Sequence, residues 1–86
     1  MNKILYYDRV HLRALQEAEL PVDERELIIQ IVPNYEADVL SGRISADAPL
    51  AKAVLHRRQG DVVTVRTRDQ SIPMRILDVE KSRAAG

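Results

Sequence analysis

The chain has 86 residues, with 13 basic and 13 acidic side chains, so its formal net charge is zero. The length predicts one small domain with a single core, and zero net charge argues against direct sequence-specific nucleic-acid binding. Three residues are aromatic (Tyr6, Tyr7 and Tyr35) and none is cysteine. This composition disfavours base-stacking pockets, aromatic ligand cages and thiolate chemistry.

The first segment with secondary-structure signals is Asp8–Leu20, and it is ambiguous. Good helix formers with apolar residues at spacings of three favour a helix after Asp8. In Arg9–Leu15, however, apolar and polar residues also alternate, which predicts a strand. Pro21 ends either element, and the residues alone leave both interpretations open.

The next elements are clearer. Glu26–Val32 (ELIIQIV) is short, rich in β-branched residues and followed by proline, as is typical of a central strand. Asn34–Arg43 is predicted to be a loop that closes on Ser41-Gly42, and Ile44 begins a short extended piece.

Asp47-Ala48-Pro49 has the pattern of a helix start. Asp47 is expected to cap the helix through its carboxylate, and Pro49 suits the first turn. Apolar residues then recur at helical spacing up to Gly60, which is placed to end the helix. The pattern predicts one helix of about ten residues.

The last segments predict a β-hairpin, with Asp61–Thr67 and Ile72–Val79 as its strands. The apolar alternation changes phase in the second strand, which predicts a bulge or bend near Asp78. Pro73 within that strand predicts a sheet edge. The whole pattern indicates an α+β domain, a mostly antiparallel sheet of four or five strands covering one helix, and residues 81–86 are expected to be a disordered tail.

No apolar stretch is long enough for a signal-peptide core or a membrane span, so we expect a cytoplasmic protein with no membrane contact. Residues 1–43 carry five basic and eight acidic side chains, and the remainder carries the reverse. Such a dipolar chain suits an oriented protein contact, although the two charge sets could also neutralise each other across the folded surface.

Several linked short motifs in residues 26–80 resemble the C-terminal domain of the bacterial Gre transcript cleavage factors. They are a strand leading to a Glu-Ala-Asp loop, an Ile-Ser strand, an acidic residue and proline opening a helix, and a Gly-Asp before the last hairpin. Val32-Pro33 and Ala48-Pro49 are closer to the Rnk subgroup, named for regulation of nucleoside diphosphate kinase. The resemblance implies a domain spanning residues 1–80 with an FKBP-like fold, a bent antiparallel sheet around one helix. In that fold Arg9–Leu15 is a strand and Gln16–Glu24 a connecting loop, whereas Rnk-like proteins begin with a helix of similar sequence. We adopt the strand, because without it the sheet loses a member and a domain this small cannot easily spare the burial.

The resemblance also bears on catalysis. In Gre factors, acidic residues at the tip of a long N-terminal coiled coil help to hold a catalytic metal. The 25 residues before the matched region cannot form two long helices, so we expect no transcript cleavage, no enzymatic activity, no metal and no cofactor. The missing aromatic pocket likewise argues against prolyl isomerase activity.

The remaining candidate metal ligands have simpler explanations. Glu36 and Asp38 could contact Mg²⁺, but the family uses this motif structurally. The acidic residues from Asp23 to Glu26 are read as a solvated loop. His11 and His56 are too few for a zinc site without cysteine.

The family implies that the chain binds protein. Gre-like C-terminal domains dock on the rim of the RNA polymerase secondary channel, against a coiled coil of the largest subunit. Asp47 would either cap the helix or pair with an arginine of that partner. Further basic residues are expected as a strip on the same helix, although solvated charges explain them equally well. The predicted partner-binding residues are Asp47, Ala48, Pro49, Leu50, Lys52, Arg57 and Arg58.

The leading hypothesis is therefore a non-catalytic, polymerase-binding regulator of transcription. The alternative is an interaction module that homodimerises through the edge near Pro73 or the apolar face of residues 4–15. A third possibility is a fragment of a longer factor, against which the initial Met1 argues weakly.

Overall fold

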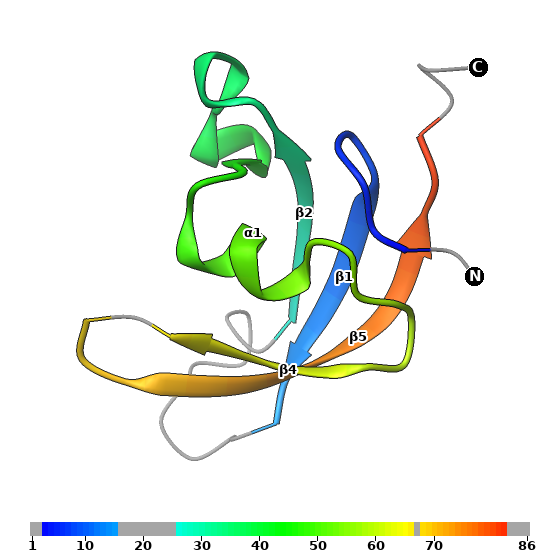
Figure 1. Cartoon of the computed structure of the whole chain (residues 1–86), viewed down its shortest axis with the longest axis vertical. Helices are drawn as coiled ribbons and strands as arrows, with labels where there is room; N and C mark the ends of the chain where they lie inside the picture. The colour runs from blue at the N-terminus through cyan, green and yellow to red at the C-terminus, as the bar shows by residue number, and fades with distance from the viewer. Residues whose placement is uncertain (1–2, 16–25, 67, 83–86) are drawn as a thin grey trace.

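The structure, a computed structural model, describes residues 3–15, 26–66 and 68–82. Within them, five strands form one sheet and one α-helix packs against it (Figure 1). Two short 3₁₀ turns, Asn34–Glu36 and Val39–Ser41, lie between the second and third strands. The elements in chain order are β1 (Arg9–Ala14), β2 (Glu26–Val32), β3 (Arg43–Ser45), α1 (Pro49–Val54), β4 (Val62–Arg66) and β5 (Ser71–Glu80).

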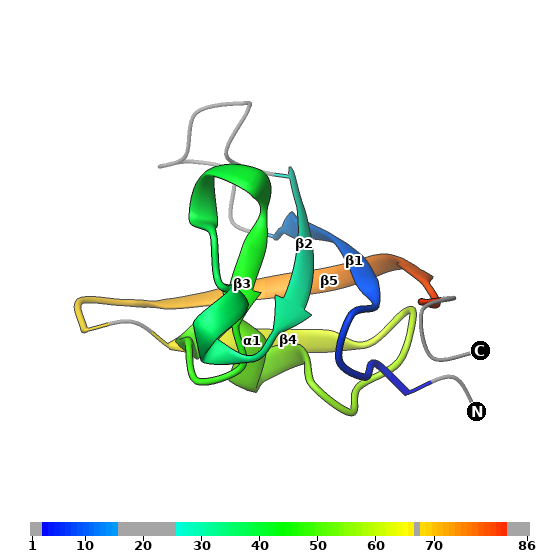
Figure 2. The same ribbon diagram turned by 90° about the horizontal axis from the view of Figure 1, so that it is seen from above.

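The sheet has the order β3-β2-β1-β5-β4 and is strongly bent. In Figure 1, β2 stands nearly upright, and β1 and the C-terminal half of β5 slant beside it. The β4–β5 hairpin crosses below them, and α1 lies inside the bend. Figure 2 shows β3, β2 and β1 side by side with α1 beneath them. The α+β prediction is confirmed, with five strands. One pair departs from the antiparallel expectation, because β3 runs parallel to β2.

The ambiguous first segment forms a strand, β1. It pairs with β2 on one side and β5 on the other, which makes it the middle of the sheet. Its side chains alternate, so that Val10, Leu12 and Ala14 are buried. Two flanking ladders and three buried apolar side chains outweigh the local helix propensity. The predicted connecting loop, Gln16–Glu24, lies outside the described residues.

The predicted bulge is present. His11 of β1 lies opposite Asp78, and Leu12 opposite Ile76, so Leu77 is the extra residue. The edge prediction based on Pro73 is wrong, because β5 lies between β1 and β4. The ring nitrogen and the carbonyl of Pro73 face β1, at the point where β1 ends. The Leu15 N–H donates to the Pro73 carbonyl there at 2.9 Å. The missing N–H of proline is tolerated because the ladder with β1 stops at this position.

The helix is shorter than predicted, with six residues. It ends because the chain turns to pair with the N-terminal segment: the Ile4 N–H donates to the Arg57 carbonyl, and the His56 N–H donates to the Ile4 carbonyl, each at 2.8 Å. His56 takes a left-handed conformation, φ 69°, at this point. Gly60, predicted to end the helix, instead lies in the turn before β4, where its N–H donates to the Ile76 carbonyl.

The core fills the inside of the bend. Ile4 closes one end of it, and Ala51 and Val54 of α1 cover the middle. The remaining buried apolar side chains come from the four longer strands, at alternate positions except for the consecutive Ile31 and Val32: Val10, Leu12, Ala14, Ile29, Ile31, Val32, Val63, Val65, Met74 and Ile76.

None of the helices in the described part of the chain is long and apolar enough to cross a membrane.

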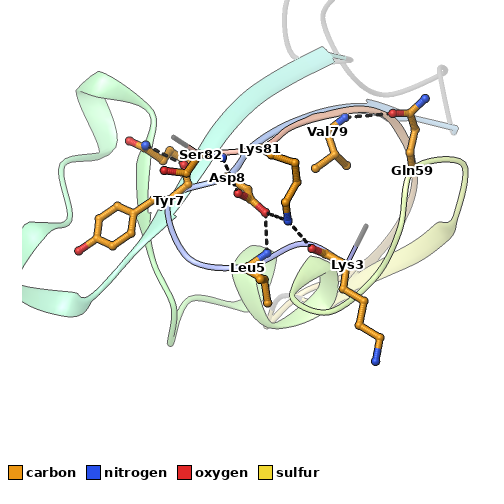
Figure 3. A network of polar contacts seen from close by, with 9 residues as sticks. Lys3, Leu5, Tyr7, Asp8, Gln59, Val79, Lys81 and Ser82 are labelled. Carbon is orange, nitrogen blue, oxygen red and sulfur yellow. Dashed lines mark hydrogen bonds and ion pairs between the residues drawn. The ribbon is translucent and has the colours of Figure 1, made fainter. Parts of the chain in front are cut away.

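A buried carboxylate joins the two ends of the described chain (Figure 3). Asp8, only 2% exposed, accepts hydrogen bonds from the backbone N–H groups of Leu5 (2.9 Å) and Ser82 (2.8 Å) and from Lys81 Nζ (2.5 Å). Burial acts to raise the pKa of Asp8, but the three hydrogen bonds and the Lys81 charge together hold it below its ordinary value. Lys81 and Ser82, placed in the tail from sequence, thus bond to Asp8, whereas residues 83–86 lie outside the described residues.

Candidate docking site

The candidate site is the corner where β3 turns into α1. The Ala46 N–H donates to the Val32 carbonyl and the Ala48 N–H to the Ser45 carbonyl, which fixes the turn against the end of β2. Pro49 is the first residue of α1, as predicted. Asp47 and Pro49 are exposed and Ala48 is half-buried, so the corner presents a carboxylate beside a proline ring.

Asp47 does not cap the helix. The cap position is Ala48, and no side chain bonds to the first helical N–H groups. Asp47 Oδ2 instead accepts a 2.5 Å hydrogen bond from Asn34 Nδ2, while Ser45 Oγ donates to Asn34 Oδ1. The Asp47 N–H donates to Ser45 Oγ at 3.1 Å. The capping prediction is wrong because the carboxylate turns toward the β2–β3 connection and away from the helix.

This arrangement leaves Asp47 Oδ1 able to accept a hydrogen bond from a partner. Within the described ranges, no hydrogen bond or ion pair reaches that oxygen. The Asp47 carboxylate is exposed and held in one orientation, and one of its two oxygens accepts no hydrogen bond within these ranges. Such a carboxylate suits a bidentate or single contact with a guanidinium group.

A shallow hollow runs from this corner across to β4. Three predicted site residues line it: Asp47, Pro49 and Lys52. Two further lining residues, Thr64 and Arg66, were not predicted from the sequence. Both belong to the outward set of β4, whose alternation was visible in the sequence, but nothing local indicated that β4 would lie beside α1. Leu50 is half-buried against the core, so its side chain supports the helix more than it lines the hollow.

The predicted basic strip on one helix does not exist. Lys52 lies on α1, but Arg57 and Arg58 follow the end of the helix. Asp61 engages both residues: Arg57 Nε lies 3.6 Å from Asp61 Oδ2, and the Arg58 N–H donates to the same oxygen at 3.0 Å. The prediction fails because His56 ends the helix by pairing with Ile4.

The other candidate ligands bond within the protein. Asp38 accepts from Ser41 Oγ, and Glu26 lies 2.9 Å from His11 Nε2. The Tyr7 hydroxyl donates a 2.5 Å hydrogen bond to Glu36. This bond, with burial and the Glu36 charge, raises the pKa of Tyr7 to about 12. No group of three or more metal-ligating side chains occurs among residues 3–15, 26–66 and 68–82.

Both surfaces suggested for a homodimer are occupied within the protein. Pro73 lies in an inner strand, and most of the apolar face of residues 4–15 is core, with Ile4, Val10 and Leu12 fully buried. The chain's own strands therefore cover most of both surfaces, while Leu5 and Leu15 stay 49% and 44% exposed.

Comparison with known proteins identifies the family. Residues 8–81 match the model of the C-terminal domain of the transcription elongation factors GreA and GreB. The chain is 45% identical over 62 residues to the transcription elongation factor GreA of Geobacillus kaustophilus, covering 72% of this chain and 39% of that protein. It is 37% identical over 57 residues to GreA of Pseudomonas putida, covering 66% of this chain and 36% of that protein. The chain thus spans less than half the length of these relatives.

Solved structures give the same result. Gfh1 of Thermus aquaticus is 29% identical, with a TM-score of 0.73 over 91% of this chain and 48% of that chain. The GreA factor homolog 1 (Gfh1) protein of Thermus thermophilus is 28% identical, with a TM-score of 0.71 over 93% of this chain and 49% of that chain. Residues 8–81 include all five strands and the helix, and the chain belongs to the GreA/GreB C-terminal domain family of transcription elongation factors.

Proposed function

We propose that this chain is a transcription regulator that binds RNA polymerase near its secondary channel through the corner Asp47–Pro49. Family membership supports a role in transcription, and the orientation of the Asp47 carboxylate carries the proposal for the site. The contact would be made with the coiled coil of the largest subunit, through an arginine that pairs with Asp47 while Pro49 packs against its apolar face.

The basic residues contribute unequally. Lys52 lines the hollow beside Asp47 and is exposed, so it can meet an acidic residue of the partner. Arg57 Nε lies 3.6 Å from Asp61 Oδ2, so this arginine already has an ion-pair partner within the chain and is expected to contribute less to the partner contact. Arg58 is exposed close by and remains part of the proposed surface.

We also propose that the chain acts without cleaving transcripts, and that it is of the Rnk type. Gre factors owe cleavage to acidic residues on a coiled coil, whereas Glu36 and Asp38 here bond to Tyr7 and Ser41. Ala48 at the helix cap, where Gre factors place serine, supports the Rnk assignment. Action in the cytoplasm, as one domain over residues 1–80, is part of the same proposal.

The test is capture of core RNA polymerase on immobilised chain. Wild type should retain polymerase, and Asp47→Arg should lose at least nine tenths of it. Asp69→Arg is the matched control, because Asp69 is an exposed carboxylate in the β4–β5 turn, and should bind as wild type does. Failure of the wild type to retain polymerase would refute the proposal. Cleavage of stalled transcripts by added wild-type chain would refute its non-catalytic part.

A further inference from the structure

A second exposed surface lies on the outer face of the sheet, away from the Asp47 corner. Ile28 on this face is 64% exposed, and Val39 and Leu40 on the turn Val39–Ser41, which adjoins β2, are 76% and 99% exposed. Val39 and Leu40 are the two most exposed large aliphatic side chains of the described ranges. Exposed apolar side chains on adjoining segments of a small domain point to a binding surface.

Strand register brings two arginines to the same face. Gln30 of β2 lies opposite Arg9 of β1 and opposite Arg43 of β3, so the three form a row across the sheet. Ile28 is two residues from Gln30 on β2 and therefore shares its face. An open hollow of about 590 Å³ is lined by Ile28 and both arginines, together with Gln30, Ser41 and Gly42.

The turn that carries Leu40 is held firmly. The Arg43 N–H donates to the Asp38 carbonyl at 2.9 Å, and Ser41 Oγ donates to the Asp38 carboxylate at 2.9 Å. The Gln30 N–H donates to the Gly42 carbonyl at 2.8 Å, which attaches the turn to β2. Leu40 is thus exposed on a turn whose backbone is held by hydrogen bonds. Binding of a partner would therefore cost little entropy for ordering this turn.

The two arginines of this surface favour an acidic partner. Of the nearby carboxylates, Glu26 contacts His11 and Asp38 accepts from Ser41 Oγ. The side chains of Arg9 and Arg43 make no hydrogen bond or ion pair with any part of the chain that the structure describes. Glu80 lies opposite Arg9 on β5 but forms no ion pair with it.

We propose that the surface formed by Arg9, Ile28, Val39, Leu40 and Arg43, here called the Ile28 patch, docks an acidic peptide segment that carries apolar side chains. The aliphatic centre would receive the apolar side chains, and the two arginines would pair with carboxylates at its rim. A nucleic acid fits less well, because the centre of the patch is aliphatic and holds no aromatic ring for a base. This surface is separate from the polymerase contact and does not depend on it.

The test uses ¹⁵N-labelled full chain and three synthetic 14-residue peptides. The first is amphipathic and contains glutamate, leucine and alanine. The second has lysine for each glutamate, and the third has serine for each leucine. The first should shift the amide signals of Ile28, Leu40 and Gly42 and bind at least about fivefold more tightly than the other two.

Substitutions within the patch complete the test. Leu40→Ser and Arg43→Glu should each weaken binding of the first peptide by about fivefold or more, since each removes a central contact or reverses a rim charge. Val62→Ser and Arg68→Glu, matched exposed residues elsewhere, should leave it within about twofold of wild type. Equal binding of the three peptides, or shifts confined to other amides, would overturn the proposal. So would tighter binding of a 12-nucleotide oligothymidylate at these amides, or self-association that Leu40→Ser abolishes.

Discussion

The side-chain amide of Asn34 holds the carboxylate of Asp47, thirteen residues further along the chain, at 2.5 Å. This bond turns Asp47 away from the helix cap and toward solvent. Asn34 is therefore a positioning residue for the proposed polymerase contact.

Replacing Asn34 with alanine should release the Asp47 carboxylate and weaken polymerase binding by about fivefold, because the carboxylate would then have to be ordered on binding. Because the bond is exposed, the free energy of unfolding should change by less than about 1 kcal/mol. A binding titration and a urea titration measure the two quantities. Gln59→Ala, which removes an exposed amide elsewhere, is the control. Equal affinities of Asn34→Ala and wild type would remove the positioning role.

Asp8→Asn should destabilise the domain. Asp8 is buried and accepts three hydrogen bonds, one of them from the Lys81 ammonium group, so neutralising it weakens all three at once. The expected loss in free energy of unfolding is about 2 kcal/mol, visible as a lower urea midpoint. Lys81→Met keeps the aliphatic stem but removes the ammonium group with its hydrogen bonds to Asp8 and the Lys3 carbonyl, while the two backbone donors to Asp8 remain, so it should lose a smaller part of this stability.

The same carboxylate predicts a pH dependence. The pKa of Asp8 is lower in the folded protein than its ordinary value of 3.8, so the folded state binds its proton less readily than the unfolded state does. Its contribution to stability is therefore complete above pH 3.8 and is lost as the pH falls through the folded-state pKa. In urea titrations, the difference between wild type and Asp8→Asn should be constant from pH 7 to about pH 5 and should shrink below about pH 4. A difference that grows toward low pH would contradict this.

Gly42→Ala should destabilise the turn that supports the Ile28 patch. Gly42 has φ 77°, and a Cβ there would lie 3.1 Å from the Ile28 carbonyl oxygen, which is backbone and cannot rotate away. The left-handed conformation alone predicts a loss of about 1–2 kcal/mol. Gly60→Ala is a close control, because φ there is 93° but no atom lies within 4 Å of the added Cβ. Thermal unfolding should show the larger loss for Gly42→Ala.

Tyr7 should ionise only in strong alkali. Its hydroxyl donates to Glu36, and this raises its pKa to about 12, so the folded state favours the protonated phenol. The resulting stability is present below the unfolded-state pKa of about 10 and is lost as the pH rises through about 12. Subtracting the absorbance titration at 295 nm of Tyr7→Phe from that of wild type should isolate this step. Glu36→Gln should move it to lower pH, and no movement would contradict the assignment.

Local patterns predicted most of the strands and the start of the helix. Alternation of apolar and polar residues placed β4 and β5, and its change of phase indicated the bulge at Leu77. Pro49 was placed correctly at the first helical position because the reason is local: its ring fixes φ and it lacks the N–H that a helix start leaves unused.

The sequence by itself therefore determined the α+β class, the hairpin and the position of the helix start, since propensity and periodicity depend on neighbouring residues. Tertiary structure decided the rest. Backbone pairing with Ile4 ended the helix before Arg57, and the bond from Asn34 decided that the Asp47 carboxylate faces the β2–β3 connection and not the helix cap. In both cases a backbone or carboxylate group could be satisfied in two ways, and only the approach of a segment distant in sequence selected between them.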